Sequence, residues 1–367
     1  MPCPQPAPNV TDVRPGKGST RDESMTKTKG RDMSAQTSRY QSDALPAETV
    51  DVAVIGGGPA GLNGALILAR SRRSGVVIDG GAPRNAPATA MHGFIVLDGT
   101  PPAEILERAR RQVRDYGGRV VLGEVAAAEP AAPTATGDLR FAIALADGRT
   151  LTARRVLVAT GLRDVLPEVP GLAEHWGRGV VHCPYCHGWE VRDEPIGILA
   201  TGPASVHHAW LFRQLTGDLV YFTRGAGLDP ETRARFAARG IRVVETDVKE
   251  IAGDGDGALA GVRLADGTLV KRRVLAVATR LEARTEGLEG LALPIEELPG
   301  DLGRRIASGT AGATGIPGVW VAGNATDLMA QVGAAAAAGA LAGAHINAAL
   351  AAADTDAALV AARQATG

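Results

Sequence analysis

A glycine-rich turn between a strand and a helix constrains the fold of this chain most. An apolar run over residues 49–55 leads into Gly56-Gly57-Gly58-Pro59-Ala60-Gly61, helical spacing follows, and a second apolar run ends at Asp79. In a dinucleotide site the first glycine permits a tight turn, the second lets the backbone approach a pyrophosphate, and the third lets the helix pack closely. The helix N-terminus supplies amide donors. This order predicts a Rossmann-like site in which Asp79 accepts hydrogen bonds from ribose hydroxyls.

The same order of elements recurs in the second half of the chain. A strand over residues 196–200 precedes a turn through Gly202 and a helix, and each half carries an Asp-Gly hairpin, at Asp147-Gly148 and at Asp266-Gly267. A strand over residues 316–322 then returns to the first domain. Strands that alternate with helices predict an α/β fold with parallel sheets. We therefore predict two Rossmann-like, three-layer ββα nucleotide-binding domains, the second inserted into the first.

The boundaries of these domains follow from the same elements. The first domain is expected to comprise residues 49–164 and 286–350, and the second residues 165–285. Residues 351–367 are predicted to form a C-terminal tail. Residues 1–48 are rich in Ser, Thr, Pro, Gly and charge without periodic apolar positions, so we expect them to be disordered.

The amino-acid composition and charge limit which classes of binding partner this protein can have. The 367 residues are 45% hydrophobic with a formal net charge of −1, so nothing in the overall balance attracts nucleic acid or an anionic membrane. The longest apolar stretch, residues 333–344, is shorter than the ~20 residues that cross a bilayer, and we read it as a tightly packed helix. Only three cysteines are present, which favours a reducing cytoplasm. The arginines of a helix near residues 104–116 are assigned to a solvated face.

Two cysteines stand two residues apart in His182-Cys183-Pro184-Tyr185-Cys186-His187, just before the second Rossmann-like strand. This spacing favours a redox disulfide. Because the thiolate is the nucleophile in disulfide exchange, a neighbouring imidazole can take the thiol proton near neutral pH. We choose His187 as this base, with His182 next in line.

Other readings of the cysteine segment are weaker. Zinc would need His182, Cys183, Cys186 and His187 together, but adjacent residues rarely both reach one tetrahedral ion, and no second Cys-x-x-Cys exists. Two cysteines packed as small hydrophobes are a further alternative. We expect no metal and a catalytic trio of Cys183, Cys186 and His187.

Three separated motifs resemble the thioredoxin reductase superfamily over roughly residues 49–350. They are the Gly56–Gly61 loop, the block from Cys183 to Gly188, and Gly318-Val319-Trp320-Val321-Ala322-Gly323-Asn324 with Gln331-Val332 beyond it. The resemblance is closer to the branch of dithiol oxidases that close disulfides in gliotoxin- and holomycin-type metabolites.

The resemblance implies an FAD domain interrupted by a smaller NADPH-type domain that carries the cysteines, usually in a homodimer. Cys186 would lie against the flavin, and Cys183 would exchange with the substrate sulfur. Residues from four segments would contact FAD. They are Gly56, Gly58, Pro59, Ala60, Gly61, Asp79, Gly80, Arg84, Asn85, His92, Ala159, Thr160, Gly161, Gly323, Asn324, Gln331 and Val332.

Three departures from the usual superfamily pattern bear on the direction of the reaction. His187 replaces an acidic residue, Asn324 replaces an aspartate, and the second loop keeps only Gly202, with the single cation Arg224 after the next strand. NADPH binding is therefore left open. Without it, a dithiol would reduce the flavin and O2 would be the simplest acceptor.

Three hypotheses follow. The first is an FAD-dependent dithiol oxidase acting on a small dithiol or disulfide metabolite. The second is an NADPH-dependent reductase of a thioredoxin-like protein. The third is a non-catalytic flavin redox sensor.

Overall fold

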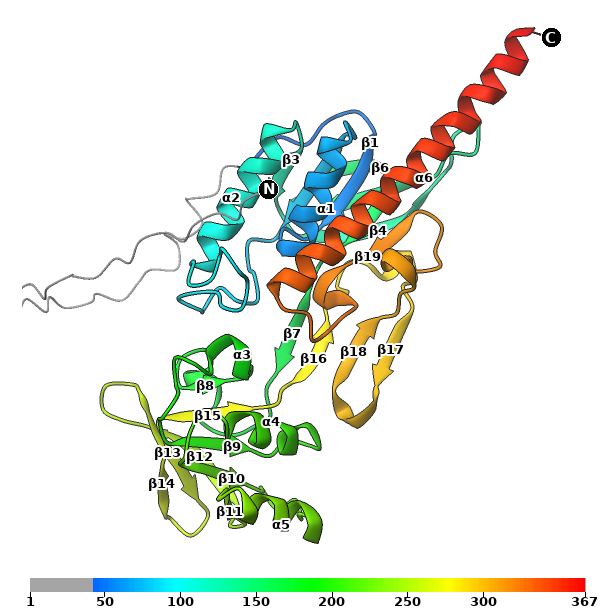
Figure 1. Ribbon diagram of the computed structural model, residues 1–367. Helices are drawn as coiled ribbons and strands as arrows, with labels where there is room; N and C mark the ends of the chain where they lie inside the picture. The colour runs from blue at the N-terminus through cyan, green and yellow to red at the C-terminus, as the bar shows by residue number, and fades with distance from the viewer. Residues whose placement is uncertain (1–41, 367) are drawn as a thin grey trace, which may run out of the picture. The chain divides into compact units, whose positions relative to one another are not determined.

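The first domain is built on a seven-stranded sheet. A computed structural model of the protein describes residues 42–366 (Figure 1). The strand order is β3-β2-β1-β6-β5-β4, and β19 also pairs with β6. Strands β1, β2, β3, β6 and β19 run parallel, whereas β4 and β5 form an antiparallel meander onto β6. The strands are β1 (Val50–Ile55), β2 (Gly75–Asp79), β3 (Arg119–Leu122), β4 (Val125–Ala131), β5 (Arg140–Leu145), β6 (Thr150–Val158) and β19 (Val319–Val321).

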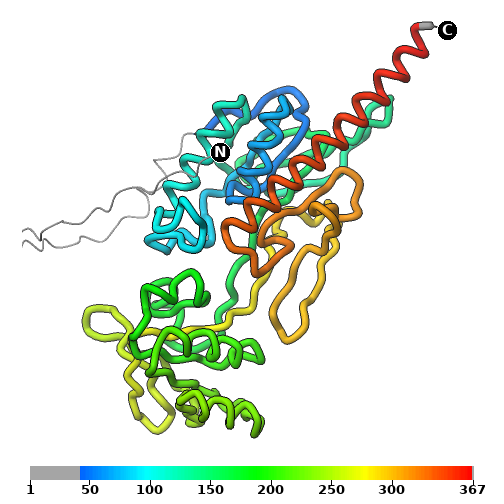
Figure 2. Tube along the Cα trace, viewed as in Figure 1, coloured from blue at the N-terminus to red at the C-terminus, as the bar shows by residue number. Residues whose placement is uncertain are grey.

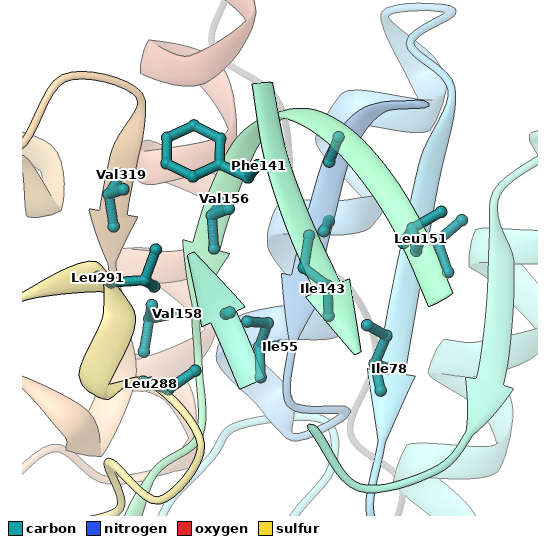
Figure 3. Close-up of a cluster of buried hydrophobic side chains, with 14 of the residues drawn as sticks. Ile55, Ile78, Phe141, Ile143, Leu151, Val156, Val158, Leu288, Leu291 and Val319 are labelled. Carbon is teal, nitrogen blue, oxygen red and sulfur yellow. The ribbon is translucent and has the colours of Figure 1, made fainter. Parts of the chain in front are cut away.

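Both faces of this sheet are buried. Alternate residues of β1 point to opposite sides: Val52 and Val54 join the cluster under the helices, whereas Ala53 and Ile55 join the cluster on the other face. Figure 3 shows that second cluster, which is closed by residues from β5 and from the turn after β16. The covering helices are α1 (Pro59–Arg70), α2 (Pro102–Asp115) and α6 (Val332–Thr366).

The second domain contains a five-stranded parallel sheet of order β11-β10-β9-β15-β8. Every residue of β9, β10 and β15 is buried, as expected for parallel strands covered on both faces. A three-stranded antiparallel sheet accompanies it. The elements are β8 (Val180–Val181), α3 (Pro184–His187), β9 (Ile196–Leu199), α4 (Ala204–Phe212), β10 (Leu219–Phe222), α5 (Pro230–Ala238), β11 (Arg242–Val244), β12 (Val248–Gly253), β13 (Leu259–Leu264), β14 (Leu269–Lys271) and β15 (Val274–Val277).

Two adjacent strands connect the domains. The chain leaves the first domain through β7 (Leu162–Val165) and returns through β16 (Arg280–Ala283), and these strands pair antiparallel (Figure 2). Strand β16 continues into a small sheet with β18 (Gly303–Ile306) and β17 (Ile295–Leu298). The predicted α/β fold with an inserted second Rossmann-like domain is confirmed.

Residues 42–48, which the sequence places in a disordered tail, make defined contacts with the first domain. Residues 1–41 lie outside the described residues, but the predicted disorder is wrong for residues 42–48. Asp43 accepts hydrogen bonds from Arg114 Nε at 2.9 Å and from the Val120 amide at 2.7 Å, and Leu45 packs against the sheet. These partners lie far away in the sequence, so local composition carries no sign of them.

Helix α6 is longer than its predicted apolar stretch. It runs for 35 residues without a break at the predicted boundary of 350. By length and composition it is the one helix among residues 42–366 that could cross a membrane. Its first half is a packed core helix, as predicted: a Cβ on Gly339 would lie 1.9 Å from the Ala60 carbonyl oxygen, and one on Gly343 would lie 2.7 Å from that of Gly64. These two glycines let α6 lie directly against α1.

Candidate active site

One cavity of about 1450 Å³ joins the glycine-rich loop to the cysteine segment. All three predicted catalytic residues line it, and so do most of the predicted FAD contacts. The lining residues among those predictions are Cys183, Cys186, His187, Gly56, Gly58, Pro59, Ala60, Asp79, Gly80, Arg84, Asn85, His92, Ala159, Thr160, Gly161, Asn324, Gln331 and Val332. Gly61 and Gly323 do not line the cavity. Gly323, with φ +71°, instead lies where a Cβ would be 2.7 Å from Ala60 Cβ.

The glycine loop has the shape that a pyrophosphate requires. Gly56 has φ +114°, and a Cβ there would lie 2.2 Å from the Ala159 carbonyl oxygen. A Cβ on Gly61 would lie 1.9 Å from the Gly56 carbonyl oxygen, so α1 can start this close only with glycine. No described side chain caps α1 at Gly58, and space there is open. The first amides of α1 are thus available to an anion at the cavity wall.

Asp79 lies at the end of β2 in a buried ion pair that sequence reasoning missed. Arg110 Nη2 donates to its Oδ2 at 2.7 Å, and the Gly81 amide donates to its Oδ1 at 2.9 Å. Arg110 Nε also donates to Oδ2, at 3.1 Å. Oδ1 keeps a second lone pair, so the predicted contact with a ribose stays compatible with these bonds. The assignment of Arg110 to a solvated face is wrong, because its side chain is only 3% exposed. The helical spacing of Leu106, Arg110 and Val113 was the available signal.

Several predicted FAD contacts are held by protein partners in this structure. Arg84 forms a bidentate pair with Asp164, at 2.6 and 2.7 Å. His92 lies between Asp98 and Glu190, at 3.3 and 3.4 Å. Thr160 Oγ1 donates to the Arg284 carbonyl at 2.7 Å. Sequence reasoning assigned these three residues to the cofactor. In the structure their side chains bond to protein groups in the wall of the cavity.

Asn324 organises the loop that precedes α6. Its Nδ2 donates to the carbonyl oxygens of Ala330 at 2.8 Å and Asp327 at 3.0 Å, with Leu328 at 3.4 Å. An ionised aspartate has no hydrogen to donate. The replacement noted in the sequence therefore has a structural role in positioning the start of α6 at the cavity.

The two cysteines are bonded to each other at the start of α3. They form a disulfide with a Cα–Cα distance of 5.3 Å, and the Cys186 amide donates to Cys183 Sγ at 3.2 Å. Both are half-buried and line the cavity. Among residues 42–366 no three His, Cys, Asp or Glu side chains are grouped to hold a metal ion.

Three histidines, His182, His187 and His208, line the same cavity as this disulfide. Burial lowers the pKa of His187, with Glu190 opposing and His92 adding to the effect, and within the described part of the chain its buried Nδ1 has no hydrogen-bond partner. Burial also lowers the pKa of His182. The His182 ring meets His208 edge to face at 5.4 Å, and burial together with His182 and His207 lowers the pKa of His208 to about 4. All three imidazoles are therefore neutral at pH 7.

In the second Rossmann-like loop a side chain occupies one of the backbone amides. Ser205 is fully buried, and its Oγ accepts the Thr201 amide at 2.9 Å, where a nucleotide loop needs free amides. Thr201 Oγ1 donates to the Ala278 carbonyl at 2.6 Å. Arg224, which also lines the cavity, donates to the Ala200 carbonyl at 3.1 Å.

Two linked dinucleotide-type domains with a disulfide opposite the glycine loop define a disulfide oxidoreductase. The chain belongs to the pyridine nucleotide-disulphide oxidoreductase family, which it matches over residues 50–339. The predicted resemblance to thioredoxin reductases is confirmed, and FAD is the cofactor of this group. The glycine loop, Asp79 and the Asn324 loop would hold FAD, and their open amides and close backbone approaches fit such a ligand.

Individual relatives agree with this membership. Thioredoxin reductase tcpT of Claviceps purpurea is 35% identical over 257 residues, which are 68% of this chain and 79% of that protein. Thioredoxin reductase sirT of Leptosphaeria maculans is 30% identical over 312 residues, which are 81% and 93%. The crystal structure of HlmI is 41% identical with a TM-score of 0.81, covering 88% of this chain and 99% of that one.

Proposed function

We propose that this oxidoreductase oxidises a dithiol to a disulfide through Cys183 and Cys186, with O2 as the terminal acceptor. The observation that carries the proposal is the single cavity that joins the cysteine pair to the glycine loop. The second loop, in which Ser205 binds the Thr201 amide, supports electron entry from a dithiol rather than from NADPH.

The chain's own residues have distinct roles in this proposal. Bound FAD supplies the two-electron acceptor for the reduced cysteine pair. Cys183 exchanges with the substrate sulfur, while Cys186, as the family resemblance implies, would lie nearer the flavin. His187 serves Cys186 as base, because burial keeps its imidazole neutral and its Nδ1 has no partner within residues 42–366.

We further propose a small dithiol metabolite as substrate rather than a thioredoxin-like protein. The cysteines are half-buried within the cavity wall, which suits a molecule that enters it. Tyr185 and Trp189 are exposed beside them and offer apolar surface to such a ligand. A homodimer, a cytoplasmic location and the absence of nucleic-acid and membrane partners complete the proposal.

Serine in place of either cysteine tests the pair. Cys183→Ser and Cys186→Ser should each abolish dithiol turnover, because neither leaves a disulfide to reduce, while FAD stays bound to the unchanged glycine loop. Turnover and flavin absorbance of the purified proteins check both parts. Turnover at the wild-type rate in either variant would refute the proposed role of the pair.

The direction of the reaction is tested by anaerobic stopped-flow absorbance. The protein is mixed separately with NADPH and with dithiothreitol, and oxygen is then admitted. Bleaching of the flavin by the dithiol alone, with recovery and peroxide formation in air, is the expected result. Rapid bleaching by NADPH would make the protein a reductase. Slow reduction by both donors would favour the redox sensor.

A further inference from the structure

The hydrogen bonds of His182 define which of its ring nitrogens carries the hydrogen. Its Nδ1 lies 3.2 Å from the Val277 carbonyl oxygen, which can only accept. The neutral ring must therefore carry its hydrogen on Nδ1, which leaves a lone pair on Nε2. His182 lines the cavity directly before Cys183 in the chain.

A series of hydrogen-bond partners behind His182 supports the same position of the ring hydrogen. Thr279 Oγ1 lies 3.4 Å from His182 Nδ1 and donates its hydrogen to Asp164 Oδ1 at 2.7 Å. The hydroxyl hydrogen is thus committed to the carboxylate, and its oxygen lone pair faces the Nδ1–H. Asp164 is itself held by the two bonds from Arg84. This series of hydrogen bonds fixes the orientation of the His182 ring and places a carboxylate behind it, as in other imidazole bases.

Burial and the positive charge of Arg84 keep the His182 ring neutral, so that it can accept a proton. Burial, then Arg84, and to a smaller extent His187 lower the pKa of His182, whereas Asp164 and the Val277 carbonyl raise it. His208 meets the ring edge to face and is itself neutral at pH 7. Burial raises the pKa of Asp164, but Arg84, the Thr279 hydrogen bond and His182 together lower it by more, so Asp164 stays ionised.

We propose that His182 is a second base of this site, which takes the proton of the substrate thiol that attacks Cys183. His187 then serves only Cys186, and Thr279 and Asp164 are positioning residues. The inference rests on the proposed oxidation of a dithiol by the cysteine pair but not on O2 as the acceptor.

The exchange balances without any other reactant. His182 Nε2 takes the proton of the first substrate thiol, whose sulfur bonds to Cys183 Sγ as the Cys183–Cys186 bond breaks and Cys186 leaves as a thiolate. The second substrate thiol gives its proton to the Cys186 thiolate, and its sulfur bonds to the first substrate sulfur. Cys183 leaves as a thiolate and takes the proton held by His182. Two electrons pass from the substrate dithiol to the cysteine pair, which ends as two thiols.

The test follows the opening of the disulfide itself. Holoenzyme is mixed anaerobically with dithiothreitol from pH 6 to about pH 10, quenched in acid, and its free cysteines are alkylated and counted by mass spectrometry. His182→Asn keeps a donor for the Val277 carbonyl but removes the Nε2 acceptor. We expect opening about 100-fold slower at pH 7. The deficit should vanish above the pKa of the dithiothreitol thiol, because that thiol then ionises unaided.

Two further variants separate a base from a structural residue. His182→Gln provides a second neutral substitution if the asparagine variant does not retain its flavin. Asp164→Asn should move the inflection of the wild-type profile to lower pH, because it removes the negative charge behind the ring. Exposed His345, changed to asparagine, is the matched control on α6.

The outcomes are distinguishable. Equal opening rates of wild type and His182→Asn at pH 7, or a deficit of the same size at every pH, would overturn the assignment of His182 as a base. An unchanged pH profile in Asp164→Asn would show that Asp164 does not act on His182. If dithiothreitol fails to open the wild-type disulfide at any pH, the proposed function fails instead.

Discussion

At the level of single residues, Asn324 shows how one side-chain amide determines the path of a loop. Its Nδ2 hydrogens bind carbonyl oxygens on both sides of Leu328. Asn324→Asp would place a carboxylate against these oxygens, and we expect unfolding to become easier by about 1–3 kcal/mol. Urea denaturation at pH 7 measures this. Unchanged stability would mean that the loop is held by other contacts.

His208 makes the stability of the protein depend on pH. Its pKa of about 4 in the folded protein lies below the ordinary value of 6.5, so the folded state favours the neutral ring. This contribution is complete above pH 6.5 and is lost as the pH falls toward 4. Between pH 7 and pH 5 it amounts to about 2 kcal/mol. His208→Phe should reduce the acid-induced loss by that amount in urea denaturation at the two pH values. An equal loss in both proteins would contradict this.

Residues with local signals were predictable, and residues with distant partners were not. The roles of Gly56 and Gly61 follow from a turn of six residues, and the cysteine pair follows from its spacing. Arg84 was assigned to FAD because its loop was recognised, but its partner Asp164 lies 80 positions further along the chain. The hydrogen bonds of Asp43 to Arg114 and Val120 likewise join segments that no local pattern connects.

At the level of elements, the contact of α6 with α1 depends on glycine. Gly339→Ala would bring a Cβ within 1.9 Å of the Ala60 carbonyl oxygen, whereas Gly333→Ala on the same helix would make only ordinary contacts of 3.5 Å or more with Phe94. We expect the first change to destabilise by about 2 kcal/mol, because the helices must separate. The second should be neutral or stabilising by up to about 1 kcal/mol.

Urea denaturation of the two alanine variants, with flavin content as a second readout, measures this difference. Equal stability would mean that the helices can adjust without loss. The sequence predicted a packed helix here, because alanine and glycine dominate residues 333–344. It did not predict the length of α6. Residues 351–366 make few tertiary contacts, so the helix there depends mainly on the helix propensity of its own residues.

For the whole molecule, the repeat of strand, turn and helix was enough to predict two domains and the insertion. What the sequence could not supply was the pairing of β7 with β16, because antiparallel register joins Val165 to Arg280 across the whole inserted domain. That pairing has a mechanical consequence. Tension applied at residues 42 and 366 enters only the first domain, since both positions belong to it. The inserted domain, tethered through two neighbouring strands, would bear no load until the flavin domain had yielded.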